Sequence, residues 1–484
     1  MSGERKLSRR AFLRAFGAGA AATALGACAP KTVVVEVEKE VTREVEKVVK
    51  ETVMVEGKPV EVTKVVKETI VVKEEVEKEV TRVVAPEPET GEIVFWSWDE
   101  ATQAPLIKGF EEKFPGFKVT HELTQNYYDT FLASLVAGAG LPDCAWCDAH
   151  AYQKFARTGQ LIALDEFLVP YKEDILPFLW DAGLVDGTQY GAPRRYASEM
   201  IWYRKDRFEE VGIDPAAIET WDDLIILGQQ AATDDEHFMT CYDQSWFDYA
   251  YQSMLFGKEG TGFYDAEDNV VVNSEENLAN TEKFLQLVQS GVARPVEYWG
   301  PDWYSIADTA KIACIVMPYW YGFEPMYSMP SPENKENWGV LPIPSLETGA
   351  KNASVWQGAM YWVIPTQAKN KDLGWKFIEY TTFDYTDAYV QMSMDYEFVL
   401  PAYEKFYEID FPFWGEAMSF YGENLRQRAH ELSQGAPVNY LPPEYDESVE
   451  ALVAELQLMF TGERTPKQML DNAAQEFEKL LQAR

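Results

Sequence analysis

The sequence has 484 residues and a formal net charge of -36 at neutral pH. That length exceeds what one small core needs and is sufficient for two lobes once the N-terminal material is set aside. The charge argues against nucleic acid as a partner, because a protein neutralises phosphates with a basic surface. Aromatic residues are abundant, with 15 Trp, 26 Tyr and 26 Phe, and many of them fall in predicted loops.

The first 28 residues predict export and a lipid anchor. A twin-arginine run at residues 8–14 (SRRAFLR) precedes a small, weakly apolar segment that is too short to span a bilayer. The segment closes with Leu-Gly-Ala-Cys, which resembles a lipobox in which the Cys28 thiol receives diacylglycerol and becomes the mature N-terminus. The alternative is a signal peptide that is cut nearby, with Cys28 incidental. The main interpretation places the protein on the outer face of the cell membrane, lipid-anchored and exported by the twin-arginine route.

Residues 29–90 are predicted to be a tether. Between residues 31 and 84 the sequence is nearly all Val, Glu, Lys and Thr, and residues 37–43 recur unchanged as residues 76–82. Steps of four and three in the second half fit a heptad seam, although Gly57 and Pro59 would interrupt it. A coiled-coil stalk and a disordered spacer both remain open.

The folded body begins with alternating strands and helices. Short apolar runs at residues 92–95, 117–123 and 144–147 predict strands, and two helical patterns lie between them. This order implies an α/β fold with a parallel sheet and right-handed crossovers. Since ligands bind outside the carboxyl ends of such strands, the residues after the first and third strands are expected near a binding crevice.

Further elements extend the pattern and carry a resemblance. A strand is predicted at residues 200–203, and Thr220 is predicted to cap a helix. The chain resembles the family 1 extracellular solute-binding proteins, the maltose-binding-like sugar receptors of ABC importers. The similar stretches are residues 95–114, 191–193, 203–208, 212–215, 220–221, 338–344, 356–365 and 370–378.

The resemblance implies a two-lobed, periplasmic-binding-protein-like α/β fold of class II type that closes on its ligand by a hinge motion. It implies a lobe 1 of residues 91–195 and 355–400, and a lobe 2 of residues 196–354 and 401–484. The implied partners are a small-molecule ligand and the permease subunits of an ABC importer. No cofactor, metal or enzymatic activity is expected.

A sugar receptor needs flat aromatic rings beneath the C–H faces of the sugar and polar groups at its rim. Such residues fall at predicted strand ends, whereas Trp96, on the opposite face of its strand from Trp98, is expected in the core. Arg194 and Arg195 fit either an acidic sugar or internal salt bridges. The expected ligand-binding residues are Trp98, Asp99, Tyr127, Asp148, Tyr196, Trp246, Tyr319, Trp320, Trp356 and Gln357.

Three other possibilities deserve comparison. Cys144, Cys147, Asp148 and His150 superficially resemble a metal cluster, but no second pair follows. Cys144, Cys147, Cys241 and Cys314 are all expected to be small buried residues, and one disulfide among them stays an alternative. The rival functions are a surface-anchored carbohydrate-active hydrolase, which would need a suitably spaced pair of carboxyl groups, and a non-catalytic adhesion module.

Overall fold

A computed structural model describes most of residues 32–484. The chain divides between residues 89 and 90 into two compact units, which are described separately. Within the described part, no helix is both long and apolar enough to cross a membrane. The described residues are 32–55, 58–81 and 90–484, except residues 125, 259–260, 266, 330, 349–358, 397, 410–414, 435, 438–439 and 484. The predicted signal peptide and Cys28 therefore lie outside them.

The first unit contains two long antiparallel strands, β1 (Thr32–Val55) and β2 (Lys58–Thr81). Their register aligns Val37 with Val76 and Val41 with Val72. The structure thus has a strand pair in place of the expected coiled coil or disordered spacer. β-Branched valine fits a strand better than a helix. A short repeat rich in valine matches both the heptad spacing of a coiled coil and the two-residue alternation of a strand. The role of this unit as a tether stays a prediction.

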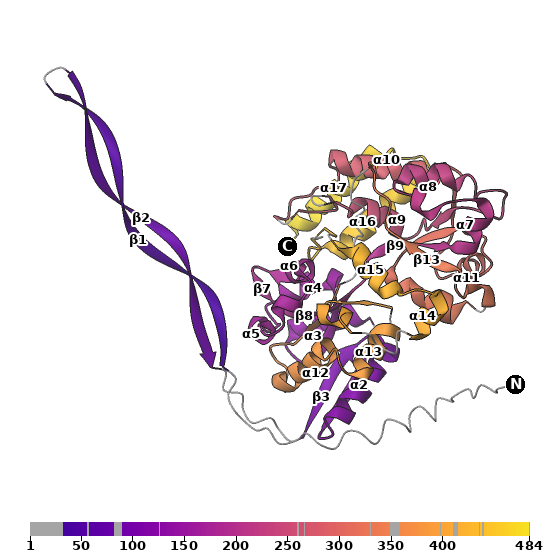
Figure 1. Cartoon of the computed structure of the whole chain (residues 1–484), viewed down its shortest axis with the longest axis horizontal. Helices are drawn as coiled ribbons and strands as arrows, with labels where there is room; N and C mark the ends of the chain where they lie inside the picture. The colour runs from indigo at the N-terminus through magenta and orange to yellow at the C-terminus, as the bar shows by residue number, and fades with distance from the viewer. Residues whose placement is uncertain are drawn as a thin grey trace. The chain divides into compact units, whose positions relative to one another are not determined.

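The first lobe of the second unit is built on a six-stranded sheet (Figure 1). Its strands lie in the order β15-β8-β14-β5-β3-β4, and β3 pairs in parallel with both β4 and β5. The predicted β-α-β-α-β order is confirmed, while β14 joins the sheet in the antiparallel direction. The strands are β3 (Gly91–Ser97), β4 (Phe117–Leu123), β5 (Cys144–Asp148), β8 (Gly191–Tyr196), β14 (Met360–Val363) and β15 (Leu400–Pro401). The helices that accompany them are α2 (Glu100–Lys113), α3 (Tyr127–Ala137), α4 (Ala149–Ala156), α12 (Lys371–Phe383) and α13 (Ala388–Tyr396).

The second lobe contains the three-stranded antiparallel sheet β12-β9-β13 and the parallel pair β10-β11. Thr220 caps α8 with a reciprocal bond to Asp223, as predicted. The strands are β9 (Glu199–Arg204), β10 (Thr240–Tyr242), β11 (Ala293–Pro295), β12 (Cys314–Pro318) and β13 (Trp338–Leu341). The helices are α7 (Lys205–Val211), α8 (Trp221–Gly228), α9 (Tyr249–Leu255), α10 (Glu275–Gln289), α11 (Pro301–Asp308), α16 (Tyr445–Phe460) and α17 (Pro466–Gln482). Smaller elements are α5 (Asp165–Leu168), α6 (Pro177–Ala182), β6 (Leu184–Val185), β7 (Thr188–Gln189), the 3₁₀ turn η3 (Tyr319–Gly322), α14 (Gly415–Tyr421) and α15 (Leu425–Ser433).

The chain changes sheets where β8 ends at Tyr196 and β9 begins at Glu199. Leu400 of β15 pairs with Tyr196, so two segments that are far apart in sequence lie side by side between the lobes. The two-lobed α/β class is therefore confirmed. The predicted crossing near residues 354–355 lies outside the described residues, and the lobe boundaries stay predictions.

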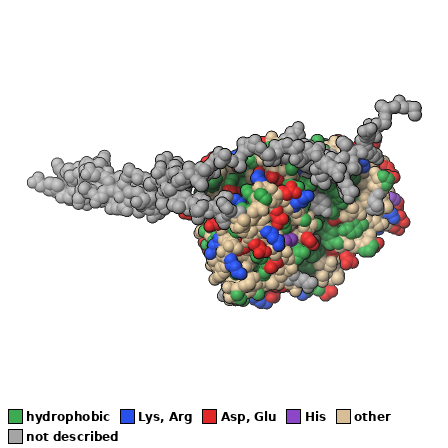
Figure 2. Space-filling model, turned by 90° about the horizontal axis from the view of Figure 1, so that it is seen from below, with side chains coloured by type: hydrophobic (Ala, Val, Ile, Leu, Met, Phe, Trp, Pro, Cys, Tyr) green, Lys and Arg blue, Asp and Glu red, His purple; other side chains and the backbone are tan. Residues whose placement is uncertain are grey.

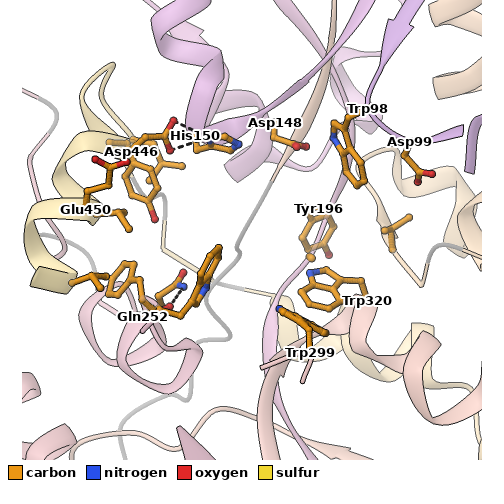
Figure 3. Close-up of a pocket in the computed structure, with 18 of the residues that line it drawn as sticks. Trp98, Asp99, Asp148, His150, Tyr196, Gln252, Trp299, Trp320, Asp446 and Glu450 are labelled. Atoms are coloured by element: carbon orange, nitrogen blue, oxygen red, sulfur yellow. Dashed lines mark hydrogen bonds and ion pairs between the residues drawn. The ribbon is translucent and has the colours of Figure 1, made fainter. Parts of the chain in front are cut away.

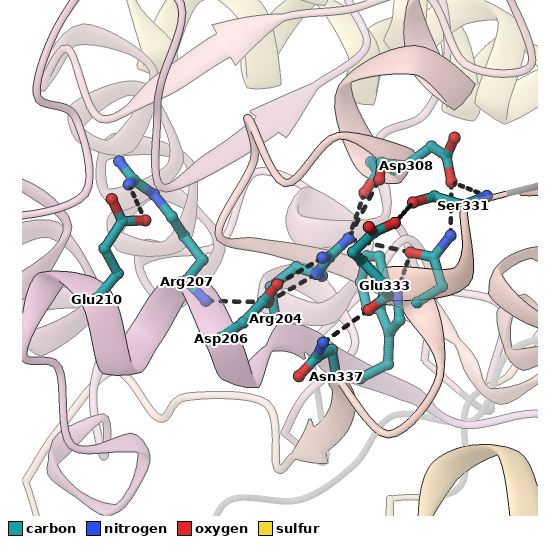
Figure 4. A network of polar contacts seen from close by, with 11 residues as sticks. Arg204, Asp206, Arg207, Glu210, Asp308, Ser331, Glu333 and Asn337 are labelled. Carbon is teal, nitrogen blue, oxygen red and sulfur yellow. Dashed lines mark hydrogen bonds and ion pairs between the residues drawn. The ribbon is translucent and has the colours of Figure 1, made fainter.

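A buried arginine holds the end of the central strand β9 (Figure 4). Arg204 is 1% exposed and donates two parallel bonds to Asp206, at 2.9 Å and 2.7 Å. Its Nη1 also donates to the carbonyl of Ala307 and to Oδ1 of Asn334, both at 3.0 Å. The guanidinium therefore joins β9, α7, α11 and the turn before β13 in one polar network.

Candidate ligand-binding site

A pocket of about 1140 Å³ lies between the two lobes (Figure 3). Its walls combine eight aromatic side chains with several carboxylates, and they come from both lobes, with the C-terminal helix α16 of the second lobe among them. The polar and aromatic lining residues are Trp98, Asp99, Thr102, Asp148, His150, Arg195, Tyr196, Ser245, Trp246, Phe247, Gln252, Trp299, Trp320, Phe323, Glu324, Tyr445, Asp446, Glu450 and Gln457.

The first lobe contributes residues that directly follow β3 and β5. Trp98 is 49% exposed, and its ring meets the buried Trp146 edge to face at 5.8 Å. Asp99 caps α2, because its carboxylate accepts bonds from Ala101 N at 2.9 Å and Thr102 Oγ1 at 2.7 Å. These contacts fix both residues at the carboxyl end of β3, as the topology predicts.

Asp148 ends β5 and is held by two donors. Trp146 Nε1 donates to Asp148 Oδ1 at 2.8 Å, and the Tyr128 hydroxyl donates to the other oxygen. Burial, followed by the charge of Asp148, raises the pKa of Tyr128 well above its usual value. Tyr128 therefore stays a hydrogen-bond donor at any ordinary pH, and the Asp148 carboxylate keeps its place in the wall.

Three tryptophans face the pocket from the second lobe. Trp246 and Trp299 are 53% and 43% exposed, which is unusual for so large an apolar side chain. The rings of Trp299 and Trp320 lie 5.5 Å apart at 35°, and Trp320 also contacts Tyr249 edge to face at 6.1 Å. Together the three rings offer the flat, rigid surface that a sugar face requires.

The C-terminal helix α16 provides a wall that the sequence did not reveal. Its lining residues follow helical spacing, and Figure 3 shows Asp446 and Glu450 beside His150 of the first lobe. The residues of this stripe are Tyr445, Asp446, Val449, Glu450, Val453, Ala454 and Gln457. An amphipathic stripe in a sequence is equally typical of core packing, so the spacing alone could not assign it to a site. Trp299, Glu324 and Gln252 were missed as well.

Two ion pairs connect α4 of the first lobe with α16. His150 Nδ1 lies 3.0 Å from Asp446 Oδ1, and Lys154 Nζ donates to Glu447 Oε1 at 2.8 Å. Burial lowers the pKa of His150, but the hydrogen bond and charge of Asp446, aided by Asp148, raise it by more, and Lys154 opposes them. The net result is a pKa above 6.5, so the imidazolium is favoured here.

We expect the unfolding free energy to depend on pH through this pair. Because the folded pKa of His150 is raised, its contribution is complete below pH 6.5 and disappears as the pH rises through the folded pKa. Urea unfolding, followed by tryptophan fluorescence at about pH 5.5 and about pH 8.5, should show that Asp446→Asn is costly at the lower pH and nearly neutral at the higher. An equal cost at both values would contradict this pairing.

The predicted site residues fall into three groups. Trp98, Asp99, Asp148, Tyr196, Trp246 and Trp320 are brought together in the pocket lining. Tyr127 and Tyr319 are buried in the core and do not line it. The Tyr127 hydroxyl donates to the carbonyl of Trp146 at 2.6 Å, and the ring of Tyr319 stacks near Trp202 at 6.2 Å. Trp356 and Gln357 lie outside the described residues.

Trp96 and four of the cysteines were expected in the core, and the structure places them there. Trp96 is buried, and its Nε1 donates to Glu122 at 2.6 Å. Cys144, Cys147, Cys241 and Cys314 are free and buried, and burial raises their thiol pKa values. Among the described residues, no group of three or more His, Cys, Asp or Glu side chains is arranged to hold a metal ion.

The charge of the pocket is mainly negative. Asp99, Asp148, Glu324, Asp446 and Glu450 line it, whereas Arg195 lies with its guanidinium 4.3 Å from the ring centre of Trp146. Residues 1–89 contain 16 basic and 16 acidic residues, so the whole net charge of -36 belongs to residues 90–484. Asp and Glu side chains are accordingly spread over the face that Figure 2 shows. An anionic ligand would meet repulsion here.

The chain is similar in sequence to known proteins. A family model described as "Bacterial extracellular solute-binding protein" matches residues 96–384. The arabinooligosaccharide-binding protein of Halalkalibacterium halodurans is 24% identical over 314 residues, which is 60% of this chain and 66% of that protein. The chain thus spans just under two thirds of this relative. The arabinooligosaccharide-binding protein of Bacillus subtilis is 22% identical over 303 residues, covering 60% and 68% of the two chains.

Solved structures share the fold at low sequence identity. The sugar-binding protein MalE from Xanthomonas citri superposes with a TM-score of 0.70 at 19% identity, over 81% of this chain and 98% of that one. The GacH receptor of Streptomyces glaucescens, solved unliganded and with acarbose, gives a TM-score of 0.68 at 20% identity, over 81% and 99%. These likenesses concern the arrangement of the two lobes.

Proposed function

This chain belongs to the family of bacterial extracellular solute-binding proteins, and we propose that it is the receptor of an ABC importer for neutral oligosaccharides. The observation that carries the proposal is the pocket between the lobes, in which Trp98 of the first lobe lies across from Trp299 and Trp320 of the second. A ligand that contacts both walls favours the closed arrangement over the open one, and the permease would recognise the closed form.

The chemistry of the walls supports a saccharide. Aromatic rings contact the C–H faces of sugar rings, while carboxylates such as Asp99, Asp148 and Glu450 accept bonds from hydroxyl groups. The volume of about 1140 Å³ lies above the usual range for a small-molecule site, which favours an oligosaccharide over a single sugar. The names of the arabinooligosaccharide-binding relatives agree with this class.

The excess of carboxylates favours neutral sugars over sugar acids. A uronate would place its charge among five carboxylates, with only the Arg195 guanidinium and the Asp446-paired His150 as cations in the lining, and that excess of negative charge lowers its affinity. Six predicted residues that line the pocket are proposed ligand contacts: Trp98, Asp99, Asp148, Tyr196, Trp246 and Trp320.

The proposal places the receptor outside the cytoplasm, as the family does. We further propose that Cys28 carries the lipid anchor, that the twin-arginine run directs export, and that residues 29–90 separate the binding unit from the membrane. These roles rest on the sequence motifs. The lobe boundaries at 195/196, 354/355 and 400/401 are part of the same proposal.

A thermal-unfolding screen tests the function. The chain with Cys28→Ser would be heated with arabinotriose, maltotriose, β-1,6-galactobiose, their monosaccharides, and trigalacturonic acid as the charged comparison. A neutral oligosaccharide at a hundred times its Kd should stabilise the protein by about 2.7 kcal/mol, whereas the sugar acid should give little change.

The ligand is recovered after the scan to separate a receptor from the rival hydrolase. An unchanged oligosaccharide supports binding without chemistry, and a cleaved one would favour the hydrolase. A shift with trigalacturonic acid alone would refute the preference for neutral ligands, and no shift with any sugar would refute the carbohydrate assignment.

A further inference from the structure

Two of the pocket tryptophans stand on neighbouring loops of the second lobe. The parallel strands β10 and β11 end at Tyr242 and Pro295, and the loops that follow them carry Trp246 and Trp299. Each ring is about half exposed, so packing against the core does not by itself fix either one. Other contacts must therefore hold the two loops in a fixed position relative to each other.

Asp243 connects the two loops directly. Its side chain is 4% exposed, and Oδ1 accepts bonds from the backbone N and from Oγ of Ser245, both at 2.7 Å. Its other oxygen, Oδ2, accepts a bond from the backbone N of Tyr298 at 2.7 Å. One carboxylate therefore bonds a residue next to Trp246 and a residue next to Trp299.

Asp248 provides a second connection between the two loops. It is 1% exposed, and its Oδ2 accepts bonds from Asp243 N at 3.0 Å and from the Tyr298 hydroxyl at 2.5 Å. Its Oδ1 accepts from Ala250 N at 2.9 Å, which anchors the loop to the start of α9. Burial raises the pKa of Asp248 to about 6 even though these hydrogen bonds lower it, so the carboxylate is charged at neutral pH.

The backbone of Trp299 indicates that the second loop is held under strain. Its φ is 67°, in the left-handed region that a bulky residue rarely adopts. Such a conformation is unfavourable for a residue with a large side chain and persists only where the surroundings over-determine it. The two bonds that Tyr298 gives to the carboxylates lie directly before this residue and supply that constraint.

We propose that Asp243 and Asp248 are positioning residues of the binding site, whose carboxylates clamp the two loops so that Trp246 and Trp299 form a preorganised aromatic wall. Preorganisation raises affinity because less conformational freedom is lost on binding. The effect on binding rests on the proposed function, but the placement of the two rings does not.

The placement is tested without any sugar by ¹⁹F NMR of protein labelled with 5-fluorotryptophan. The signals of Trp246, Trp299 and Trp98 are assigned from single Trp→Phe variants. In Asp243→Asn an amide NH₂ replaces one acceptor, so it faces the donor of Ser245 or of Tyr298. We expect the signals of Trp246 and Trp299 to shift and broaden, whereas that of Trp98, on the other lobe, stays in place.

Two further variants make the result decisive. Tyr298→Phe removes only the hydroxyl bond to Asp248, so it should fold and shift the Trp299 signal. Asp143→Asn is the matched control, because Asp143 is 3% exposed and accepts from Asn370 N and Val94 N at 2.7 Å and 2.9 Å in the first lobe. It should leave both signals unchanged. If Trp246 and Trp299 keep their signals in Asp243→Asn and Tyr298→Phe, the proposal is overturned.

A binding cycle with arabinotriose and maltotriose as probes tests the consequence. Asp243→Asn should weaken binding by roughly tenfold or more, because a loosely held site loses affinity. In a background with both Trp246→Ala and Trp299→Ala, the same change should have less than about a twofold effect, since Asp243 acts through those rings. An undiminished loss in that background would overturn the proposal. If the wild type binds neither probe, the proposed function fails in this form, and the NMR result alone decides the positioning role.

Discussion

A Trp320→Ala variant is expected to bind neutral oligosaccharides about a hundredfold more weakly than the wild type. Trp320 occupies the middle of the second-lobe wall, where its ring contacts both Trp299 and Tyr249. Its removal would delete a sugar-stacking surface and take away one of the ring contacts of Trp299. Truncation of a central aromatic residue at a binding surface commonly costs about 2–4 kcal/mol, which corresponds to this loss.

The measurement is isothermal titration with arabinotriose and maltotriose. Trp180→Ala serves as the matched control, because Trp180 lies on α6 outside the pocket lining and contacts Lys172. We expect the control to keep wild-type affinity. If Trp320→Ala also keeps it while the wild type binds, the second-lobe aromatic wall does not contact the sugar.

An Arg204→Ala variant is expected to lose about 3–5 kcal/mol of unfolding free energy. The guanidinium is buried, and its removal would leave the oxygen of Asn334 and the carbonyl of Ala307 without their charged donor. It would also remove the cation that lies 5.5 Å from the ring centre of Trp338. The substitution therefore destabilises the contacts of β9, the central strand of the second-lobe sheet, with the turns beside it.

Urea unfolding followed by circular dichroism measures this loss. The exposed Arg428, whose nearest ion pair is 3.9 Å long, is the matched control, and Arg428→Ala should change the unfolding free energy by less than about 0.5 kcal/mol. Arg204→Lys should lie between them, since an ammonium group cannot reproduce the paired bonds to Asp206. Equal stability of the two alanine variants would contradict the structural role of the network.

Residues at strand ends were predictable from the sequence, and residues on distant helices were not. Trp98, Asp99 and Asp148 follow apolar runs in a β-α-β-α-β pattern, and that topology alone brings strand ends together. The α16 wall comes from residues about 300 positions later in the chain. No local pattern distinguishes a helical stripe that lines a pocket from one that packs in a core, because both are amphipathic.

The errors have similar causes. Tyr127 and Tyr319 lie close to strand ends in sequence, but Tyr127 begins helix α3 and Tyr319 begins the turn η3, and both side chains are buried in the core. Their place after a strand does not determine which way the first side chain of the following helix or turn points. In the N-terminal repeat, the positions of the valines match both a coiled-coil heptad and the alternation of a strand. Only the pairing of residues 32–55 with residues 58–81 separates the two.

The C-terminal origin of one pocket wall bears on when the site can form during synthesis. Residues 445–457 follow every described strand of the two lobes in the sequence, so they are synthesised after all of those strands, and domains generally fold as units. A nascent chain that stops before α16 would carry the tryptophan walls but would lack Glu450 and Asp446, the partner of His150. The pocket between the lobes is therefore complete only after α16 has been synthesised and has packed against α4 of the first lobe.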